Sequence, residues 1–182
     1  VAFGRPWRNP ESGHPWVDVD GATGVRLATQ HLIDRGHTRI AWIGWRKGSY
    51  IGEDRRAGWC QVMDEHGLPT TGLASRVDDV VSSGREAATV LLDEARPTAF
   101  VCASDTLAMG VVQTLTERGM SVGRDVAVVG FELENNDKKH AFGGLLTLAS
   151  HAMAGVFVAG NASAARAAQE AMKTYSAHYP LA

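Results

Sequence analysis

Short apolar runs alternate with amphipathic patterns along the middle of this 182-residue chain, and this alternation constrains the fold more than any other feature. The runs have the length of buried strands, and apolar residues at helical spacing follow each of them. Strands that alternate with helices in this way form a parallel sheet covered on both faces, with right-handed connections. The sequence therefore predicts an α/β fold.

The same pattern places the individual elements. We expect strands at 39–44, 76–81, 99–103 and 126–131, and helices at 21–36, 55–66, 84–95 and 104–118. Three of these helices end in the same way, with a basic residue followed by glycine, at Arg35-Gly36, His66-Gly67 and Arg118-Gly119. The basic group complements the helix dipole, and the glycine can adopt the left-handed conformation that stops a helix.

The functional edge of such a sheet lies beyond the carboxyl ends of its strands, where loops converge. The segments that follow the predicted strands there are 45–54, Ser104-Asp105 and 132–136. Ser104 is the last strand residue and is expected to face a small molecule. Asp105 begins the helix, so we expect it to act as a cap first and as a ligand contact second. Nothing nearby in the sequence would activate the Ser104 hydroxyl as a nucleophile.

The motifs of common enzymes are missing from the chain. It contains no GxSxG, P-loop or GxGxxG sequence, and its seven histidines follow no zinc-ligand spacing. We therefore expect no enzyme, no cofactor and no metal site. Two cysteines, Cys60 and Cys102, are too few for a disulfide framework and are expected to be buried thiols in a reducing cytoplasm.

The charge composition of the chain argues against two kinds of partner, DNA and membranes. The formal net charge is -2, so no basic field favours DNA or an anionic membrane surface. The stretch 141–160 lacks formal charges and has the length of a membrane span, but its glycines and polar residues argue against insertion.

Five blocks of sequence occur in the order and at the spacing of one known family. They are DGATGVRLATQHLIDRGHTRIAWIG, RRAGW, GREAATVLL, RPTAFVCASDTLAMG and GRDVAVVGFE. Together they resemble the effector-binding domain of the LacI/GalR transcription regulators, and the resemblance extends over residues 1–132. It implies a two-lobed, periplasmic-binding-protein-like fold of type I, represented mostly by its second lobe, with an incomplete first lobe.

The resemblance also implies a division of the chain. Residues 1–20 would be the end of the first lobe and the crossover, and residues 21–132 the second lobe. Residues 133–182 would be a return segment where the match fades, and its Ala-rich, helix-prone stretch NASAARAAQEAMKTYSAH lacks the usual closing strands. The DNA-binding helix-turn-helix of the family is not in this chain.

Carried over residue by residue, the resemblance implies an effector pocket. Trp16 would pack on the ligand, Arg55 would donate to its hydroxyls, and Ser104 occupies a position that contacts the effector. Glu132 stands where aspartate is usual, and Arg5 is a candidate from the first lobe. A guanidinium and a carboxylate suit neighbouring hydroxyls, and an indole suits an apolar ring face. For Arg55 the alternative is a surface ion pair with a neighbouring carboxylate.

The function implied is sensing of a sugar-like metabolite by a cytoplasmic, homodimeric repressor-type regulator. Ligand binding would change lobe closure and thereby operator affinity, with DNA contacted only through the helix-turn-helix. Two alternatives stay open at this point: a periplasmic sugar-binding protein for transport, and a small α/β enzyme acting on sugars.

Overall fold

A four-stranded parallel sheet forms the centre of the molecule. The computed structural model describes residues 2–3, 16–131 and 157–159. The strands follow the order β4-β3-β5-β6 and all neighbours are parallel. Their bounds are Ile40–Trp45 for β3, Ala74–Val77 for β4, Ala99–Cys102 for β5 and Ala127–Val129 for β6. The predicted parallel α/β sheet is confirmed.

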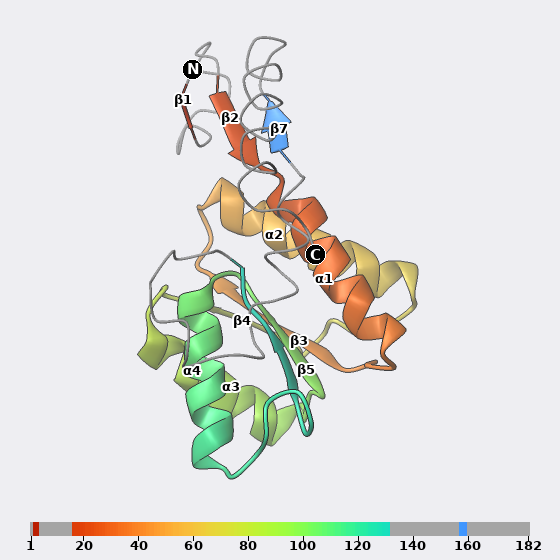
Figure 1. Cartoon of the computed structure of the whole chain (residues 1–182), viewed down its shortest axis with the longest axis vertical. Helices are drawn as coiled ribbons and strands as arrows, with labels where there is room; N and C mark the ends of the chain where they lie inside the picture. Colours follow the sequence, from red (N-terminus) through yellow and green to blue (C-terminus); the bar gives the residue numbers. More distant parts are fainter. Residues whose placement is uncertain (1, 4–15, 132–156, 160–182) are drawn as a thin grey trace, which may run out of the picture.

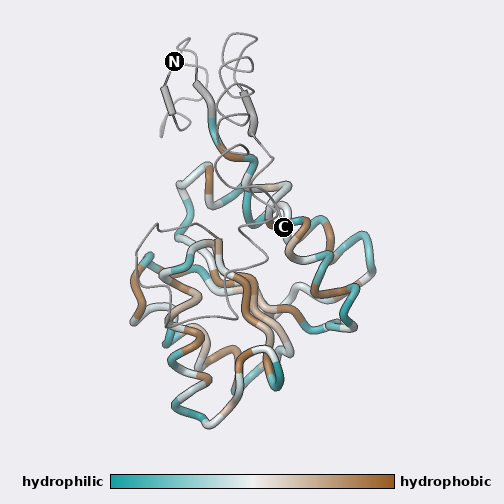
Figure 2. The backbone as a smooth tube through the Cα atoms, viewed as in Figure 1, coloured by the Kyte–Doolittle hydropathy of each residue, from teal (hydrophilic) through white to brown (hydrophobic). Residues whose placement is uncertain are grey.

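Helices cover both faces of this sheet. Helices α1 (Gly21–Asp34) and α2 (Tyr50–Glu65) pack together on one side, and α3 (Val81–Glu94) and α4 (Asp105–Glu117) pack together on the other (Figure 1). Figure 2 shows the hydrophobic strands in the centre and helices whose hydrophobic and hydrophilic residues alternate. Burial of both sheet faces explains why the inner strands are continuous apolar runs.

The core is built around aromatic side chains from both a strand and a helix. Trp42 on β3 and Trp59 on α2 are almost fully buried, and their stacked rings lie 6.3 Å apart between centroids. Phe100 on β5 is fully buried as well. Such rings contribute large apolar areas to the core. Of the two thiols expected to be buried, Cys102 is buried, whereas Cys60 is only partly so.

The three predicted glycine stops are confirmed. Gly36, Gly67 and Gly119 have φ angles of +89°, +63° and +70°. In each case the residue after the glycine donates its backbone N–H to a carbonyl five residues earlier, and the glycine donates to a carbonyl three residues earlier, as in the Schellman motif. The fourth helix, α3, ends differently, because Arg96 adopts a φ of +48°.

The predicted boundaries of three elements are wrong by three residues or more, and one of them is helix α3, which begins at Val81 rather than at residue 84. Helix α2 begins at Tyr50 rather than at residue 55, because the Ser49 hydroxyl caps it by accepting from the Gly52 N–H. Strand β4 covers Ala74–Val77 rather than 76–81, and the chain leaves the sheet before Asp78. Because β4 is an edge strand with no buried residue, it lacks a clear apolar signature.

A second, three-stranded sheet contains β1 (Ala2–Phe3), β2 (Trp16–Val19) and β7 (Phe157–Ala159). Strand β2 pairs in parallel with β1 and antiparallel with β7. It leads into α1, whose cap residue Asp20 accepts from the N–H of Thr23. Segments far apart in the sequence therefore meet beside the start of α1.

Part of the C-terminal prediction lies outside the described residues. This holds for the Ala-rich helix and for most of the uncharged stretch 141–160, of which β7 is described. Within the described part of the chain, no helix has the length and apolar character that a membrane span requires.

Candidate functional site

The candidate site lies between β3 and β5, where the direction in which successive strands are added to the sheet reverses. After β3 the chain passes through α2 to β4 at one edge, and after β5 it passes through α4 to β6 at the other edge. Because the two connections diverge, the carboxyl ends of β3 and β5 border a crevice, which is the usual ligand position in sheets of this kind. The predicted rim segments 45–54 and 104–105 both lie here.

Arg55 joins three strand ends at this crevice. The side chain projects from α2 and is buried, with 6% of the residue exposed. Its Nη1 donates to the carbonyl oxygen of Ala103, directly after β5, at 2.5 Å. The guanidinium carbon also lies 5.0 Å from the centroid of the Trp45 ring and 3.8 Å from that of Phe131. Arg55 is therefore a buried residue of the crevice, and cation–π contacts support it there.

The acidic residue Glu53, two positions before Arg55, has a different partner. Glu53 forms a bidentate ion pair with Arg76 of β4, with oxygen–nitrogen distances of 2.5 and 2.8 Å. The hydrogen bonds from Arg76 hold the pKa of Glu53 below its ordinary value. This ion pair attaches the first turns of α2 to the edge strand.

Ser104 is the cap of helix α4, which corrects the expectation that Asp105 is the cap. The Ser104 backbone is extended, and its Oγ accepts from the N–H of Leu107 at 3.3 Å. Asp105 is the first helical residue, so its side chain does not occupy the capping position. Ser104 is also fully buried, and its hydroxyl donates to Oδ1 of Asp79 at 2.5 Å.

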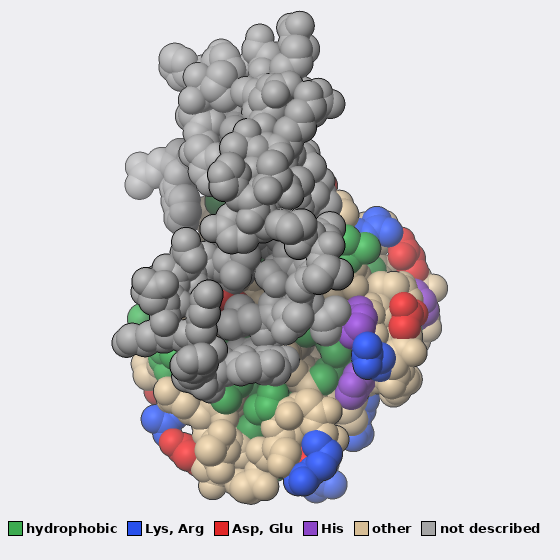
Figure 3. Space-filling model, in the orientation of Figure 1, with side chains coloured by type: hydrophobic (Ala, Val, Ile, Leu, Met, Phe, Trp, Pro, Cys, Tyr) green, Lys and Arg blue, Asp and Glu red, His purple; other side chains and the backbone are tan. Residues whose placement is uncertain are grey.

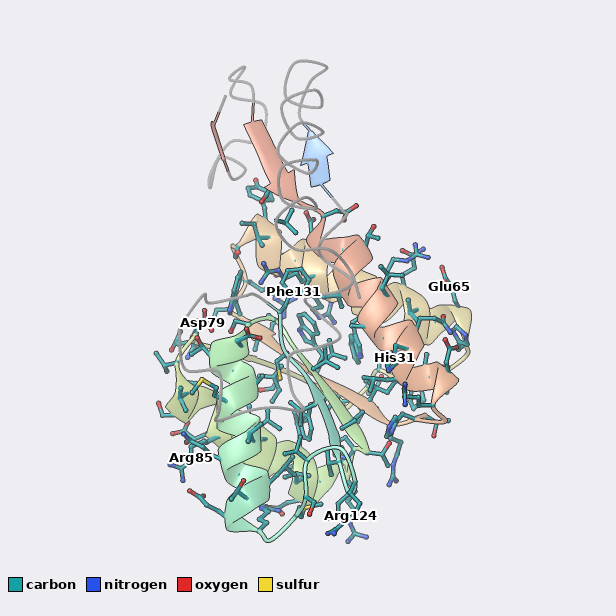
Figure 4. The ribbon with its side chains drawn as sticks, in the orientation of Figure 1. His31, Glu65, Asp79, Arg85, Arg124 and Phe131 are labelled. Atoms are coloured by element: carbon teal, nitrogen blue, oxygen red, sulfur yellow. The ribbon has the colours of Figure 1, made fainter. Side chains whose placement is uncertain are left out.

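Asp79 is a site residue that the sequence reasoning missed. It follows β4, whereas the strand predicted at 76–81 includes it and so removes it from the rim. The available signal is the pair of adjacent carboxylates, Asp78 and Asp79, directly after a short β-prone run. Figure 4 shows Asp79 at the same end of the sheet as Phe131, with Arg124 at the opposite end.

A cavity of about 580 Å³ opens between the loops that follow β3 and β4. Its lining consists of Trp45, Arg46, Lys47, Gly48, Ser49, Ile51, Val77, Asp78 and Asp79. The volume falls in the range of small-molecule sites. Arg46 and Asp78 connect the two loops by a bidentate ion pair of 2.6 and 3.0 Å.

The structure describes the side chains of three of the six predicted site residues. The structure brings Arg55, Ser104 and Asp105 to one edge of the sheet. Trp16 lies in β2, but its side chain is outside the described part, and Arg5 and Glu132 lie outside the described residues altogether.

The described surface carries charges of both signs. Figure 3 shows Lys and Arg side chains interspersed with Asp and Glu side chains on the visible face, without a patch of one sign among the described residues. This distribution agrees with the small net charge of the chain and differs from the basic stripe of a nucleic-acid-binding surface.

The sheet order, the crevice at its reversal point and the adjoining cavity define a ligand-binding lobe of the doubly wound α/β class. Residues 29–138, more than half of the chain, match the model of the periplasmic binding protein-like domain. The chain belongs to this family and represents the effector-binding domain of the LacI/GalR type.

One sequence relative and two solved structures show what the chain is similar to. The HTH-type transcriptional regulator CelR of Thermobifida fusca is 37% identical over 134 residues, which is 72% of this chain and 39% of CelR. A LacI-family regulatory protein from Chloroflexus aggregans has a similar structure, with a TM-score of 0.72 at 37% identity over 84% of this chain and 56% of that one. A CelR–cellobiose complex gives a TM-score of 0.69 at 34% identity, covering 79% and 44% of the two chains. The chain thus spans less than half the length of the curated relative.

Proposed function

We propose that this chain is the effector-sensing domain of a cytoplasmic DNA-binding transcription regulator and that it binds a sugar-like metabolite. The observation that carries the proposal is the buried Arg55, which contacts the ends of β3, β5 and β6 at the reversal point of the sheet. A planar guanidinium fixed in this position can donate hydrogen bonds to neighbouring hydroxyls of a ligand. One of the similar solved structures is a complex of CelR with cellobiose.

The proposed mechanism couples ligand binding to domain geometry. Strand β2 enters the lobe at α1 and also pairs with β7, so these strands form the connection through which a second lobe would move. A ligand that binds better to one closure state shifts the population toward that state. In the proposed regulator this shift alters operator affinity through a DNA-binding segment that is not in this chain.

The proposal includes three further statements. Residues 21–132 form the second lobe, residues 1–20 the end of the first lobe and the crossover, and residues 133–182 a return segment. The regulator is a homodimer, and the domain binds its effector without chemical conversion. Trp16, Arg55, Asp105, Glu132 and Arg5 are the proposed effector-binding residues, whereas the predicted Ser104 is fully buried and is proposed to act only through Asp79.

Calorimetric titration of the chain with neutral mono- and disaccharides, followed by chromatography of the incubated sugars, tests the sensing role. We expect saturable binding of at least one sugar, recovery of that sugar unchanged, and loss of binding in Arg55→Ala. Conversion of any sugar would contradict the sensing role, as would the absence of binding across the panel. A sedimentation experiment that finds only monomer would contradict the homodimer.

A further inference from the structure

Asp79 differs from the other charged side chains that line the cavity, because its carboxylate accepts a hydrogen bond from the buried Ser104 hydroxyl. Two of them, Arg46 and Asp78, neutralise each other in a bidentate ion pair. The other two are Lys47 and Asp79, and neither has an ion-pair partner within the described part of the chain. The lining therefore carries two positive and two negative charges, and this balance favours a ligand without net charge.

The carboxylate of Asp79 is held by a residue that cannot easily move. Ser104 is fully buried, and its Oγ is fixed as the cap of α4 by the N–H of Leu107. The Ser104 hydroxyl donates to Oδ1 of Asp79, which joins the end of β5 to the loop after β4. A serine hydroxyl has a single proton to donate, so in this arrangement the proton of Ser104 is committed to Asp79.

These contacts change the role that the sequence suggested for Ser104, which was expected to face the ligand directly. Asp79 is exposed and lines the cavity, whereas Ser104 is completely inaccessible. An ionised carboxylate is an acceptor only, and it can accept from two neighbouring hydroxyls at once. Its ligand must therefore present hydrogen-bond donors.

From this geometry we infer that Asp79 determines the specificity of the cavity by accepting hydrogen bonds from adjacent hydroxyls of a neutral polyol, and that Ser104 positions Asp79. The inference rests on the proposed function, because it concerns the effector of that same domain. It assigns direct ligand contact to a residue after β4 rather than to the residue at the end of β5.

The test compares Asp79→Asn with the control Asp93→Asn in the 182-residue chain. Both variants remove one carboxylate charge, but Asp93 lies in α3 outside the cavity, and its oxygens are engaged by Arg118. The probes are cellobiose, glucose, galactose and arabinose, with inorganic phosphate as the anionic comparison. Binding is measured by calorimetry, and thermal unfolding confirms that each variant is folded.

The expected result is that Asp79→Asn weakens binding of the recognised sugar about tenfold or more, and that Asp93→Asn changes it less than about twofold. Asp79→Asn that binds the sugar as the wild type does would overturn the inference and leave the sensing role intact. Failure of every sugar to bind would overturn both. Binding of phosphate in preference to the sugars would overturn the assignment to a neutral polyol.

A double-mutant cycle tests the positioning role of Ser104. Ser104→Ala alone is expected to weaken sugar binding, whereas the same change in the Asp79→Asn background is expected to have little further effect, because the contact that it removes acts through Asp79. Equal, additive losses in the two backgrounds would show that Ser104 supports only the fold and would overturn this part.

Discussion

The Nη1 of Arg55 and the carbonyl oxygen of Ala103 lie 2.5 Å apart, and this hydrogen bond connects helix α2 to the end of strand β5. The two elements lie on opposite sides of the point where the sheet reverses its order. The contact is buried, and the rings of Trp45 and Phe131 lie against the guanidinium. Arg55 therefore has a structural role in the crevice in addition to its proposed contact with a ligand.

Replacing Arg55 is expected to lower stability. In Arg55→Ala the carbonyl of Ala103 loses its charged donor in a buried position and the two rings lose a packing partner, which together cost about 2–3 kcal/mol in the free energy of unfolding. Chemical denaturation measures this loss. Arg26→Ala is the control, because the Arg26 side chain is 42% exposed and lies 3.8 Å from Glu65, and it is expected to change stability by less than about 0.5 kcal/mol. Equal effects of the two changes would contradict the role of Arg55.

Substitutions at two helix ends are expected to change the free energy of unfolding in opposite directions. Gly67 has a φ of +63°, and a β-carbon added there would meet open space, so Gly67→Ala is expected to destabilise by about 1 kcal/mol through backbone strain alone. Arg96 occupies the same left-handed region without being glycine, so Arg96→Gly is expected to stabilise by a few tenths of a kcal/mol to about 1 kcal/mol. Thermal unfolding of the two variants checks both signs. A fall in stability for Arg96→Gly would contradict the strain at that residue.

The contact between α3 and α4 depends on glycine. A β-carbon at Gly110 would lie 2.6 Å from the backbone nitrogen of Arg85, and one at Gly84 would lie 2.6 Å from the carbonyl oxygen of Leu107. Gly110→Ala is therefore expected to destabilise by about 1–3 kcal/mol, although alanine is the better helix former by about 1 kcal/mol. Urea denaturation measures the change. Thr116→Ala, at an exposed position of α4, serves as the control and is expected to be nearly neutral. A stabilised Gly110→Ala variant would refute the close approach of the two helices.

The ion pair between Glu53 and Arg76 predicts a dependence on pH. Because the Arg76 hydrogen bonds lower the pKa of Glu53 in the folded state, the contribution to stability is present above the ordinary pKa of 4.5 and is lost as the pH falls through the folded-state pKa. Glu53→Gln is expected to be less stable than the wild type at pH 7 by no more than about 1 kcal/mol, since the pair is partly exposed. Denaturation series at several pH values should show that the difference shrinks as the pH falls below 4.5 and disappears once the pH is below the lowered folded-state pKa of Glu53. A difference that persists unchanged in acid would contradict the assignment.

Strands β3, β5 and β6 and the three glycine stops were predictable because each has a local cause. A strand buried on both faces is a continuous apolar run, and a glycine after a basic residue is a strong local stop signal. Strand β4 lacks this signal because it lies at the edge of the sheet and none of its residues is buried. The misplaced end of β4 is also the reason that sequence reasoning does not find Asp79 as a site residue.

The remaining differences arise from tertiary contacts. Serine and aspartate are both good caps, so the sequence alone could not decide between Ser104 and Asp105. The burial of Arg55 depends on Phe131 and Ala103, which are distant from it in the sequence. Periodicity describes neighbours on one element and contains no information about such pairs.

The central claim is that the crevice at the carboxyl ends of β3 and β5, together with the adjoining cavity between the loops after β3 and β4, binds a neutral sugar. Mapping of backbone amide chemical shifts during a sugar titration tests this claim most directly. The account predicts that the amides which shift at saturating sugar cluster at residues 45–51, 77–79 and 103–105. Shifts concentrated instead on the outer surfaces of α3 and α4, or no shifts with any sugar of the panel, would contradict it.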